Sequence, residues 1–402
     1  MSGLDFGLWT LDFVIRVLTL DFGPWTLDLA MALKVLIGPD KFKGTLTALE
    51  AAHAMAAGWR SSRPQDELEL LPITDGGDGF GDIVSALLEA EPQTIKTVDA
   101  AHRACEAAWW WHPASKTAVV ESARAIGLAQ LPANKYHPFE LDSEGLGRLL
   151  KAAADKGAAR CLVGIGGSAT NDGGFGLARA LGWQFFSIRD KKIVRWTELR
   201  TLAQVRPPEH WRKFDSLIAA VDVQNPLLGA AGCTRVYGPQ KGLRPEEFDF
   251  AERCLEQLAG IIAKELHVHY ADEPGAGAAG GLGFGLRCFA GAQLEPGFAL
   301  FSRYAKLEER VRRSQLVITG EGAVDASTIM GKGVGELARL CRQAGLPCLA
   351  LCGFAPDPLS AKQLFTDIYA LTPDFTSREE ATSQPRMWLE KLAAKAASEW
   401  RA

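Results

Sequence analysis

The sequence has no pair of cysteines at the spacing of a metal or redox motif. Its eight cysteines are scattered over 402 residues, and no Cys-x-x-Cys occurs among them. A chain of this length does not need disulfides to hold a core together. We therefore expect reduced thiols, as in a cytoplasmic protein, and no cysteine-based metal centre.

The chain also has no excess of positive charge. It contains 44 Lys and Arg against 48 Asp and Glu, a net charge of -4. This balance argues against a large surface for the phosphate backbone of a nucleic acid, and it leaves a small anionic substrate possible. With 47% apolar and 23% charged residues, the composition is typical of a globular protein. We expect a monomer or homodimer with no nucleic acid partner.

The first thirty residues lack both the basic start of a secretory signal and an uninterrupted apolar span. Instead they contain two near-copies, LDFGLWTLDF (4–13) and LDFGPWTLDL (20–29). A membrane-spanning helix needs about 20 mostly apolar residues, and a signal peptide begins with basic residues. We expect no membrane partner and interpret residues 1–30 as a non-core extension, with Met31 as the functional start. An amphipathic anchor is the alternative.

Three familiar ligand motifs are incomplete. No G-x-x-x-x-G-K-[ST] sequence occurs, which excludes a P-loop. Gly166 and Ser168 are followed by Thr170 where a nucleophile elbow needs Gly. The same loop matches G-x-G-x-x-A after an apolar run, but no acidic residue ends a second strand about 20 positions later. A nicotinamide-dependent hydroxy-acid dehydrogenase is therefore a distant alternative.

Short apolar runs alternate with glycine-rich turns and alanine-rich helical segments from Lys34 onward. This alternation predicts an α/β fold of mostly parallel sheets flanked by helices, Rossmann-like or flavodoxin-like. TIKTVDA and EAAWWWH predict paired strands, and QFFSIRDKKIV predicts a hairpin. Because the length exceeds what one core supports, we expect two domains. Residues 31–90 and 295–402 would form a discontinuous domain, with residues 91–294 inserted as the second.

Carboxylates follow four of these apolar runs. In open α/β sheets ligands bind beyond the carboxyl ends of the strands, so these side chains could converge there. Carboxylates suit Mg²⁺, and glycine-rich backbone at helix starts suits phosphate. Together they are typical of phosphoryl transfer, although each acid alone could only make a turn or cap a helix. The acids are Asp75 with Asp78, Asp172, Asp222, and Glu321 with Asp325.

Seven segments, taken in order, resemble the conserved blocks of the type I glycerate kinases. The resemblance extends from Met31 to the C-terminus. It implies a two-domain α/β kinase that phosphorylates D-glycerate with ATP and Mg²⁺, generally to 2-phosphoglycerate, in a cleft. The segments are GPDKFKGTLTALEAA, LPITDGGDGF, VGIGGSATNDGGFG, DVQNPLLG, GPQKG, PGAGAAGGLGFGL and VITGEGAVDAST followed by GK.

The resemblance also implies roles for individual residues. Asp75, Asp222 and Lys43 are the expected catalytic residues, with Asp222 as general base because it ends an apolar strand on a turn stiffened by Pro226. Glu321 and Asp325 are the expected metal ligands, drawn from the same pool of acids. The residues expected to contact substrate or phosphate are Gly166, Gly167, Ser168, Thr170, Asn171, Asp172, Lys241, Gly277 and Lys332.

Four positions depart from the family pattern. Lys41 stands where the family commonly has Ser, and Asp78 where it has Glu. Ala323 and Ser327 replace a usual Arg and Gln in the VITGEGAVDAST segment. Lys41 would add positive charge near a bound anion, whereas Ala323 and Ser327 lack the long polar side chains of the usual Arg and Gln. A related hydroxy acid could therefore replace glycerate, and a non-catalytic binding protein of the same fold is the second alternative.

Overall fold

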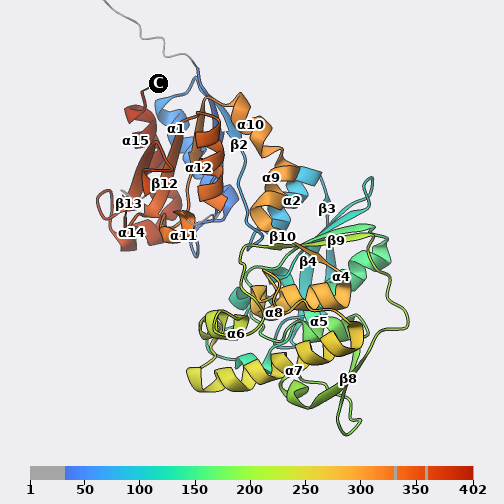
Figure 1. Ribbon diagram of the computed structural model, residues 1–402. Helices are drawn as coiled ribbons and strands as arrows, with labels where there is room; N and C mark the ends of the chain where they lie inside the picture. The colour runs from blue at the N-terminus through green and yellow to red at the C-terminus, as the bar shows by residue number, and fades with distance from the viewer. Residues whose placement is uncertain (1–31, 330–332, 358–360, 402) are drawn as a thin grey trace, which may run out of the picture. The chain divides into compact units, whose positions relative to one another are not determined.

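The structure is a computed structural model that describes residues 32–329, 333–357 and 361–401 (Figure 1). From Leu33 onward the chain forms one compact unit. The interpretation of residues 1–30 and the expected role of Lys332 lie outside the described residues. Within the described residues, no helix has both the length and the apolar character needed to cross a membrane.

The first sheet is parallel throughout, and its strands come from both ends of the chain. Its order is β13-β12-β11-β1-β2. Val35 and Ile37 of β1 pack with α1 and α15, while Leu36 between them packs with α9, α10 and α12. Both faces are therefore buried, as is usual for a parallel sheet. The bounds are β1 Lys34–Ile37, β2 Glu67–Leu70, β11 Leu316–Thr319, β12 Cys348–Phe354, β13 Asp367–Thr372, α1 Ala48–Ser62, α9 Gly297–Ala305, α10 Leu307–Arg313, α12 Gly333–Gln343 and α15 Pro385–Glu399.

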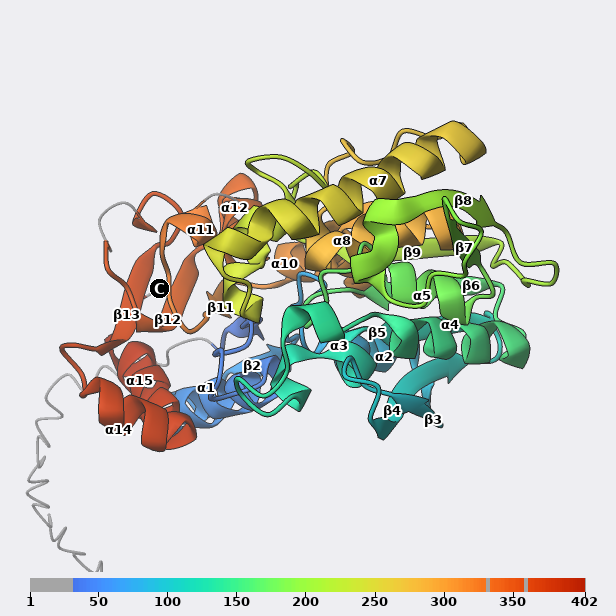
Figure 2. The ribbon, with the colours of Figure 1, turned by 90° about the horizontal axis from the view of Figure 1, so that it is seen from below.

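The first and last helices of this layer, α1 and α15, lie side by side (Figures 1 and 2). Thr47 and Glu50 start α1 with a reciprocal cap, because Thr47 Oγ1 accepts from Glu50 N at 3.2 Å and Glu50 Oε2 accepts from Thr47 N at 2.9 Å. At Gly58 an added Cβ would lie 2.0 Å from Glu390 O of α15. The two helices therefore pack closely over the sheet.

The second sheet is mixed, in the order β10-β9-β6-β5-β4-β3. Its first four strands are parallel, and β3 and β4 are antiparallel, as TIKTVDA and EAAWWWH predicted. Hydrophobic side chains of α4, α5 and α8 pack in the core on one face, and α2 and α9 cover the other. The bounds are β3 Glu91–Val98, β4 Ala104–His112, β5 Thr117–Glu121, β6 Arg160–Gly164, β9 Ser216–Val221, β10 Gln293–Pro296, α2 Phe80–Leu88, α3 Ala123–Ile126, α4 Glu144–Lys156, α5 Phe175–Ala180, α6 Cys233–Tyr237, α7 Phe248–Leu266 and α8 Ala278–Gly285.

The expected hairpin within QFFSIRDKKIV is only partly correct. A turn there brings Phe186 and Lys192 into a single antiparallel bridge. The ladder partner of β7 (Gln184–Ser187) is instead β8 (Leu202–Arg206), which follows a longer connection. Trp196 and Leu199 in that connection are buried in the core. The chain therefore packs this connection into the core between β7 and β8, so the pairing strand comes later in the chain than the charged turn suggested.

The α/β fold with mostly parallel sheets flanked by helices is confirmed. The strands of the first sheet lie in residues 34–70 and 316–372, and those of the second lie in residues 91–296. This membership agrees with a domain inserted into another. The two-domain division with its boundaries at residues 90 and 294 stays a prediction, since the chain from Leu33 onward groups as one compact unit.

Candidate active site

A single cavity of about 1140 Å³ receives the loops that follow strands of both sheets. This volume slightly exceeds the usual range for one drug-sized ligand, about 300–1,000 Å³. The expected site residues that line it are Lys43, Asp75, Gly166, Gly167, Ser168, Asp222, Lys241, Glu321 and Asp325. The acids therefore gather at the carboxyl ends of the strands, as the pattern of acidic turns predicted.

Two glycine loops meet backbone to backbone at the floor of this cavity. Gly166 N, after β6, donates a hydrogen bond to Gly76 O, after β2, at 3.2 Å. A Cβ on Gly166 would lie 2.5 Å from the Cα of Gly77, and one on Gly76 would lie 2.9 Å from the Cβ of Ala220. Side chains at these glycines would force the loops apart, so glycine is required by close approach. The contact joins the loop carrying Asp75 to the loop carrying Ser168.

Lys41 lies among the carboxylates of the cavity. Burial alone would lower the pKa of its ammonium, but surrounding negative charge outweighs burial and raises that pKa. A Cβ on Gly77 would lie only 2.6 Å from Lys41 Nζ, so the ammonium lies over the glycine loop. The carboxylates that raise the pKa are those of Asp75, Asp40, Asp78 and Asp222. The cavity therefore holds a positive charge at Lys41.

The loop after β6 presents Ser168 to the cavity and buries the polar residues that follow it. Ser168 Oγ accepts from Thr170 N at 3.1 Å and lies 3.0 Å from Thr170 Oγ1. Asn171 Nδ2 donates to Thr234 Oγ1 at 3.2 Å, while its Oδ1 has no partner among the described residues. Thr170, Asn171 and Asp172 are fully buried and do not line the cavity. Their expected contact with substrate stays a prediction, since the structure buries them behind the cavity lining.

Asp172 ties this loop to the starts of two helices. Its Oδ2 accepts from Ser143 N at 2.9 Å, from Ser143 Oγ at 2.7 Å and from Gly176 N at 2.9 Å. Its Oδ1 accepts from Gly174 N at 3.2 Å. Burial first, and the charge of Asp142 second, raise the pKa of Asp172 despite these donors. These hydrogen bonds give Asp172 a structural role that needs no bound ligand.

Lys241 and Gly277 support the loops from behind. Lys241 Nζ donates to Thr170 O at 2.6 Å, and burial lowers its pKa to about 8. Gly277 N donates to Asn225 O at 2.9 Å, and a Cβ there would lie 2.2 Å from Pro226 O. Lys241 therefore reaches the cavity wall while bonded to the loop after β6, and Gly277 packs under the turn that carries Asp222 without lining the cavity.

Glu321 and Asp325 belong to one loop after β11. Thr328 Oγ1 donates to Glu321 Oε1 at 2.6 Å and accepts from Asp325 N at 3.2 Å. The short helix α11, Ala326–Ile329, follows them. With Asp75 and Asp222 they supply only carboxylate oxygens to the cavity, the donor type that Mg²⁺ prefers. The residues present therefore fit a magnesium ion, and Ala323 lines the same stretch of wall.

Asp222 comes directly after β9 and is exposed in the cavity wall, as expected for a residue that meets substrate. Tyr237, also in the wall, donates from its hydroxyl to Asn225 Oδ1 at 2.6 Å. Burial, and then the charge of Asp222, raise the pKa of Tyr237 to about 12. The phenol therefore stays protonated beside a carboxylate.

Sequence reasoning missed several residues of this wall. Asp40, which ends the run VLIGPD, lines the cavity, whereas Glu121, which ends β5, does not. Both carry the same signal as the acids that were found, a carboxylate after an apolar run. Glu121 is buried and accepts from Gly79 N at 3.1 Å and Gly81 N at 2.8 Å, so it shapes the turn after Asp78. Tyr237 and Phe354 carry no such signal, and their place in the wall follows only from tertiary contacts.

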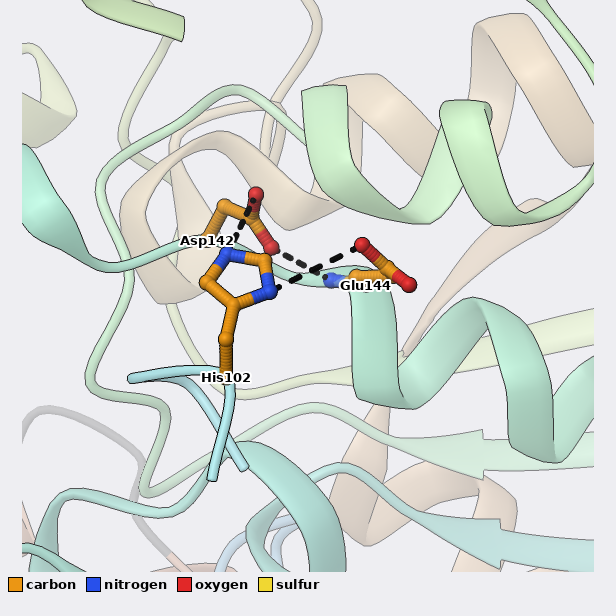
Figure 3. Close-up of side chains that lie close together, drawn as sticks. All are labelled: His102, Asp142 and Glu144. Carbon is orange, nitrogen blue, oxygen red and sulfur yellow. Dashed lines mark hydrogen bonds and ion pairs between the residues drawn. The ribbon is translucent and has the colours of Figure 1, made fainter. Parts of the chain in front are cut away.

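Outside the cavity, His102, Asp142 and Glu144 form a group with the spacing of a metal site (Figure 3). However, each imidazole nitrogen already faces a carboxylate: Nε2 lies 3.1 Å from Asp142 Oδ2, and Nδ1 lies 3.7 Å from Glu144 Oε2. Arg179 and Arg148 also contact these acids. The geometry is that of a protonated histidine between two carboxylates, an ion pair instead of a metal centre.

We predict that His102 stabilises the fold in a pH-dependent manner. Its hydrogen bond with Asp142 raises the pKa of His102 above 6.5, against the effect of burial. The stabilisation is therefore complete below about pH 6.5, the unfolded-state pKa, and is lost as pH rises through the folded-state value. His102→Gln should lower Tm at about pH 5.5 and change it little at about pH 9. Exposed His53→Gln is the control, and equal losses at both pH values would contradict the prediction.

Comparisons with known proteins agree with the motifs. A model of the glycerate kinase family matches residues 35–401. A glycerate kinase of Halalkalibacterium halodurans is 36% identical over 89% of this chain and 96% of its own length. The glycerate 2-kinase of Escherichia coli is 36% identical over 81% of this chain and 86% of its own. A crystal structure assigned to glycerate kinase 2 of Salmonella typhimurium covers 92% of this chain and 98% of its own, with a TM-score of 0.75 and 32% identity. The resemblance is confirmed, and the chain belongs to the glycerate kinase family, a family of phosphotransferases.

Proposed function

We propose that the protein transfers the γ-phosphoryl group of ATP to D-glycerate, with Mg²⁺, giving 2-phosphoglycerate and ADP. The observation that carries this proposal is the single cavity in which Lys41, Ser168 and the glycine loops meet the carboxylates after β9 and β11. Phosphoryl transfer needs positioning, charge neutralisation and an acceptor for one proton. The family and the name of the Escherichia coli relative support the substrate and the product.

The glycerate carboxylate is proposed to bind at Lys41 and the loop after β6. Lys41 is a cation placed over Gly77, and Ser168 lies on the adjoining loop. A charged donor to a carboxylate forms a strong hydrogen bond. Lys241 donates to Thr170 O, so its proposed role is to hold the loop. Lys43, exposed at the cavity edge, is proposed to meet the phosphates.

Asp222 is proposed to act as the general base. It takes the proton from the glycerate hydroxyl as that oxygen bonds to the γ-phosphorus, and the bond from the γ-phosphorus to the bridging oxygen breaks to release ADP. Its position directly after β9, beside Tyr237, fixes its backbone in the cavity wall. Asp75 is proposed to orient Lys41, whose charge it neutralises.

Glu321 and Asp325 would hold the magnesium ion. When bound there, the ion would neutralise charge on the transferring phosphates. Thr328 orients Glu321 by donating to one of its carboxylate oxygens at 2.6 Å.

The proposed reaction is tested by mixing purified protein with ATP, Mg²⁺ and D-glycerate. We expect ADP release that depends on both substrates, and a phosphorus NMR signal for phosphate on the C2 hydroxyl. Phosphate on the C3 hydroxyl would contradict the product. Binding of D-glycerate without any ADP release would instead favour the non-catalytic binding protein, the reading suggested by Ala323 in the cavity wall.

Asp222→Asn should lower kcat on the order of a hundredfold or more, since general bases contribute about 10²- to 10⁴-fold. The fold should be kept, because Asp222 is exposed and lies outside the strand. ADP release and thermal unfolding measure the two effects. Asp155→Asn, on the exposed side of α4, is the matched control and should behave like the wild type. A nearly unchanged kcat for Asp222→Asn would show that Asp222 is not the general base.

Lys41→Gln should raise KM for D-glycerate about tenfold or more while changing KM for ATP much less, because it removes a charged hydrogen bond to the small acid. Steady-state kinetics with each substrate varied in turn measures this split. Lys34→Gln removes a largely exposed lysine, 3.9 Å from Glu67, and should change neither constant. Equal effects on both KM values would show that Lys41 does not select the acid.

A further inference from the structure

One end of the cavity is not used by any of these roles. There the lining comes from the C-terminal part of the chain, from the end of β12 to the start of α15, and includes several apolar side chains. Phe354, the last residue of β12, is 44% exposed, although most large hydrophobic side chains of the described residues are buried. The other apolar members of this end are Leu371, Pro373, Ala381 and Pro385. We name this set the apolar end.

The backbone of Phe354 is fixed to the loop proposed to hold the metal. Phe354 N donates to Gly322 O at 3.1 Å, and Val324 N donates to Phe354 O at 3.0 Å. Gly353 N donates to Glu321 O at 3.2 Å. The apolar end therefore adjoins the loop that carries Glu321 and Asp325.

A polar rim borders the apolar end. It is formed by Thr372, Thr376 and Thr382 and by Arg378, the first residue of α14 (Arg378–Ser383). Two of the hydroxyls are engaged locally, since Thr372 Oγ1 donates to Gly353 O and Thr382 Oγ1 donates to Arg378 O. The guanidinium of Arg378 is exposed and has no hydrogen bond or ion pair among the described residues. The Arg378 side chain can therefore donate hydrogen bonds to a ligand.

We infer that the apolar end is the subsite for the purine base of the nucleoside triphosphate, with the base against Phe354 and the phosphates directed along the loop from Glu321 to Asp325. This inference rests on the proposed function. A planar aromatic surface with apolar flanks favours a base that can stack, whereas a small hydroxy acid needs the charged end. A cavity of about 1140 Å³ also offers room beyond that of a three-carbon acid. Arg378 supplies donors to the base or the sugar.

The inference is tested by isothermal titration of ADP into the wild type, Phe354→Ala and Phe354→Trp. Loss of stacking should weaken ADP binding about tenfold in Phe354→Ala, and Phe354→Trp should retain it. Inorganic tripolyphosphate should bind the wild type and Phe354→Ala equally, because it has phosphates and no base. In turnover, KM for ATP should rise in Phe354→Ala while KM for D-glycerate stays within about twofold.

Ile188→Ala is the matched control, since Ile188 is 74% exposed and does not line the cavity. Unchanged ADP affinity in Phe354→Ala, or an equal loss of tripolyphosphate binding, would overturn the base subsite. These outcomes are distinct from failure of the proposed function, which would appear as wild-type protein that does not phosphorylate D-glycerate at all. An unfolding temperature of Phe354→Ala equal to that of the wild type would exclude misfolding as the cause of weakened binding.

Discussion

The contact between the glycine loops after β2 and β6 is the constraint on which the site depends. Gly76 O accepts a hydrogen bond from Gly166 N, and no side chain fits between Gly166 and Gly77. Only this close approach brings Asp75, which follows a strand of the first sheet, to the same cavity as Ser168, which follows a strand of the second. The chemistry proposed for the protein requires groups from both sheets, so it requires these glycines.

Charge balance is the second requirement of the cavity. Six carboxylates line it, and a half-buried lysine beside four of them keeps a raised pKa because their charges outweigh the cost of burial. Lys41 therefore gives one part of the cavity a built-in cation, whereas Glu321 and Asp325 would hold a metal ion in another part. This division explains how one acidic cavity can receive a carboxylate at one place and magnesium with phosphates at another.

Much of the fold and several site residues could be predicted because parallel strands leave local signals. An apolar run followed by a turn with a carboxylate marked β2, β6, β9 and β11, and the acids after three of these strands line the cavity. The same signal could not separate Asp172 from Asp222. Asp172 is buried by donors from Ser143 and Gly176, whereas Asp222 is exposed, and that difference depends on partners elsewhere in the chain. Phe354 ends the apolar strand β12 and is nevertheless exposed, and no local pattern shows this because its surroundings come from segments distant in sequence.

The most direct test of this account is a crystal structure with D-glycerate and a non-hydrolysable ATP analogue bound together. The account predicts the acid between the loops of residues 75–78 and 166–168, with its carboxylate at Lys41 and its hydroxyl facing Asp222. It also predicts that the two glycine loops stay in contact in the complex. Binding of the acid outside this junction, or separation of Gly166 from Gly76 when both ligands are bound, would contradict it.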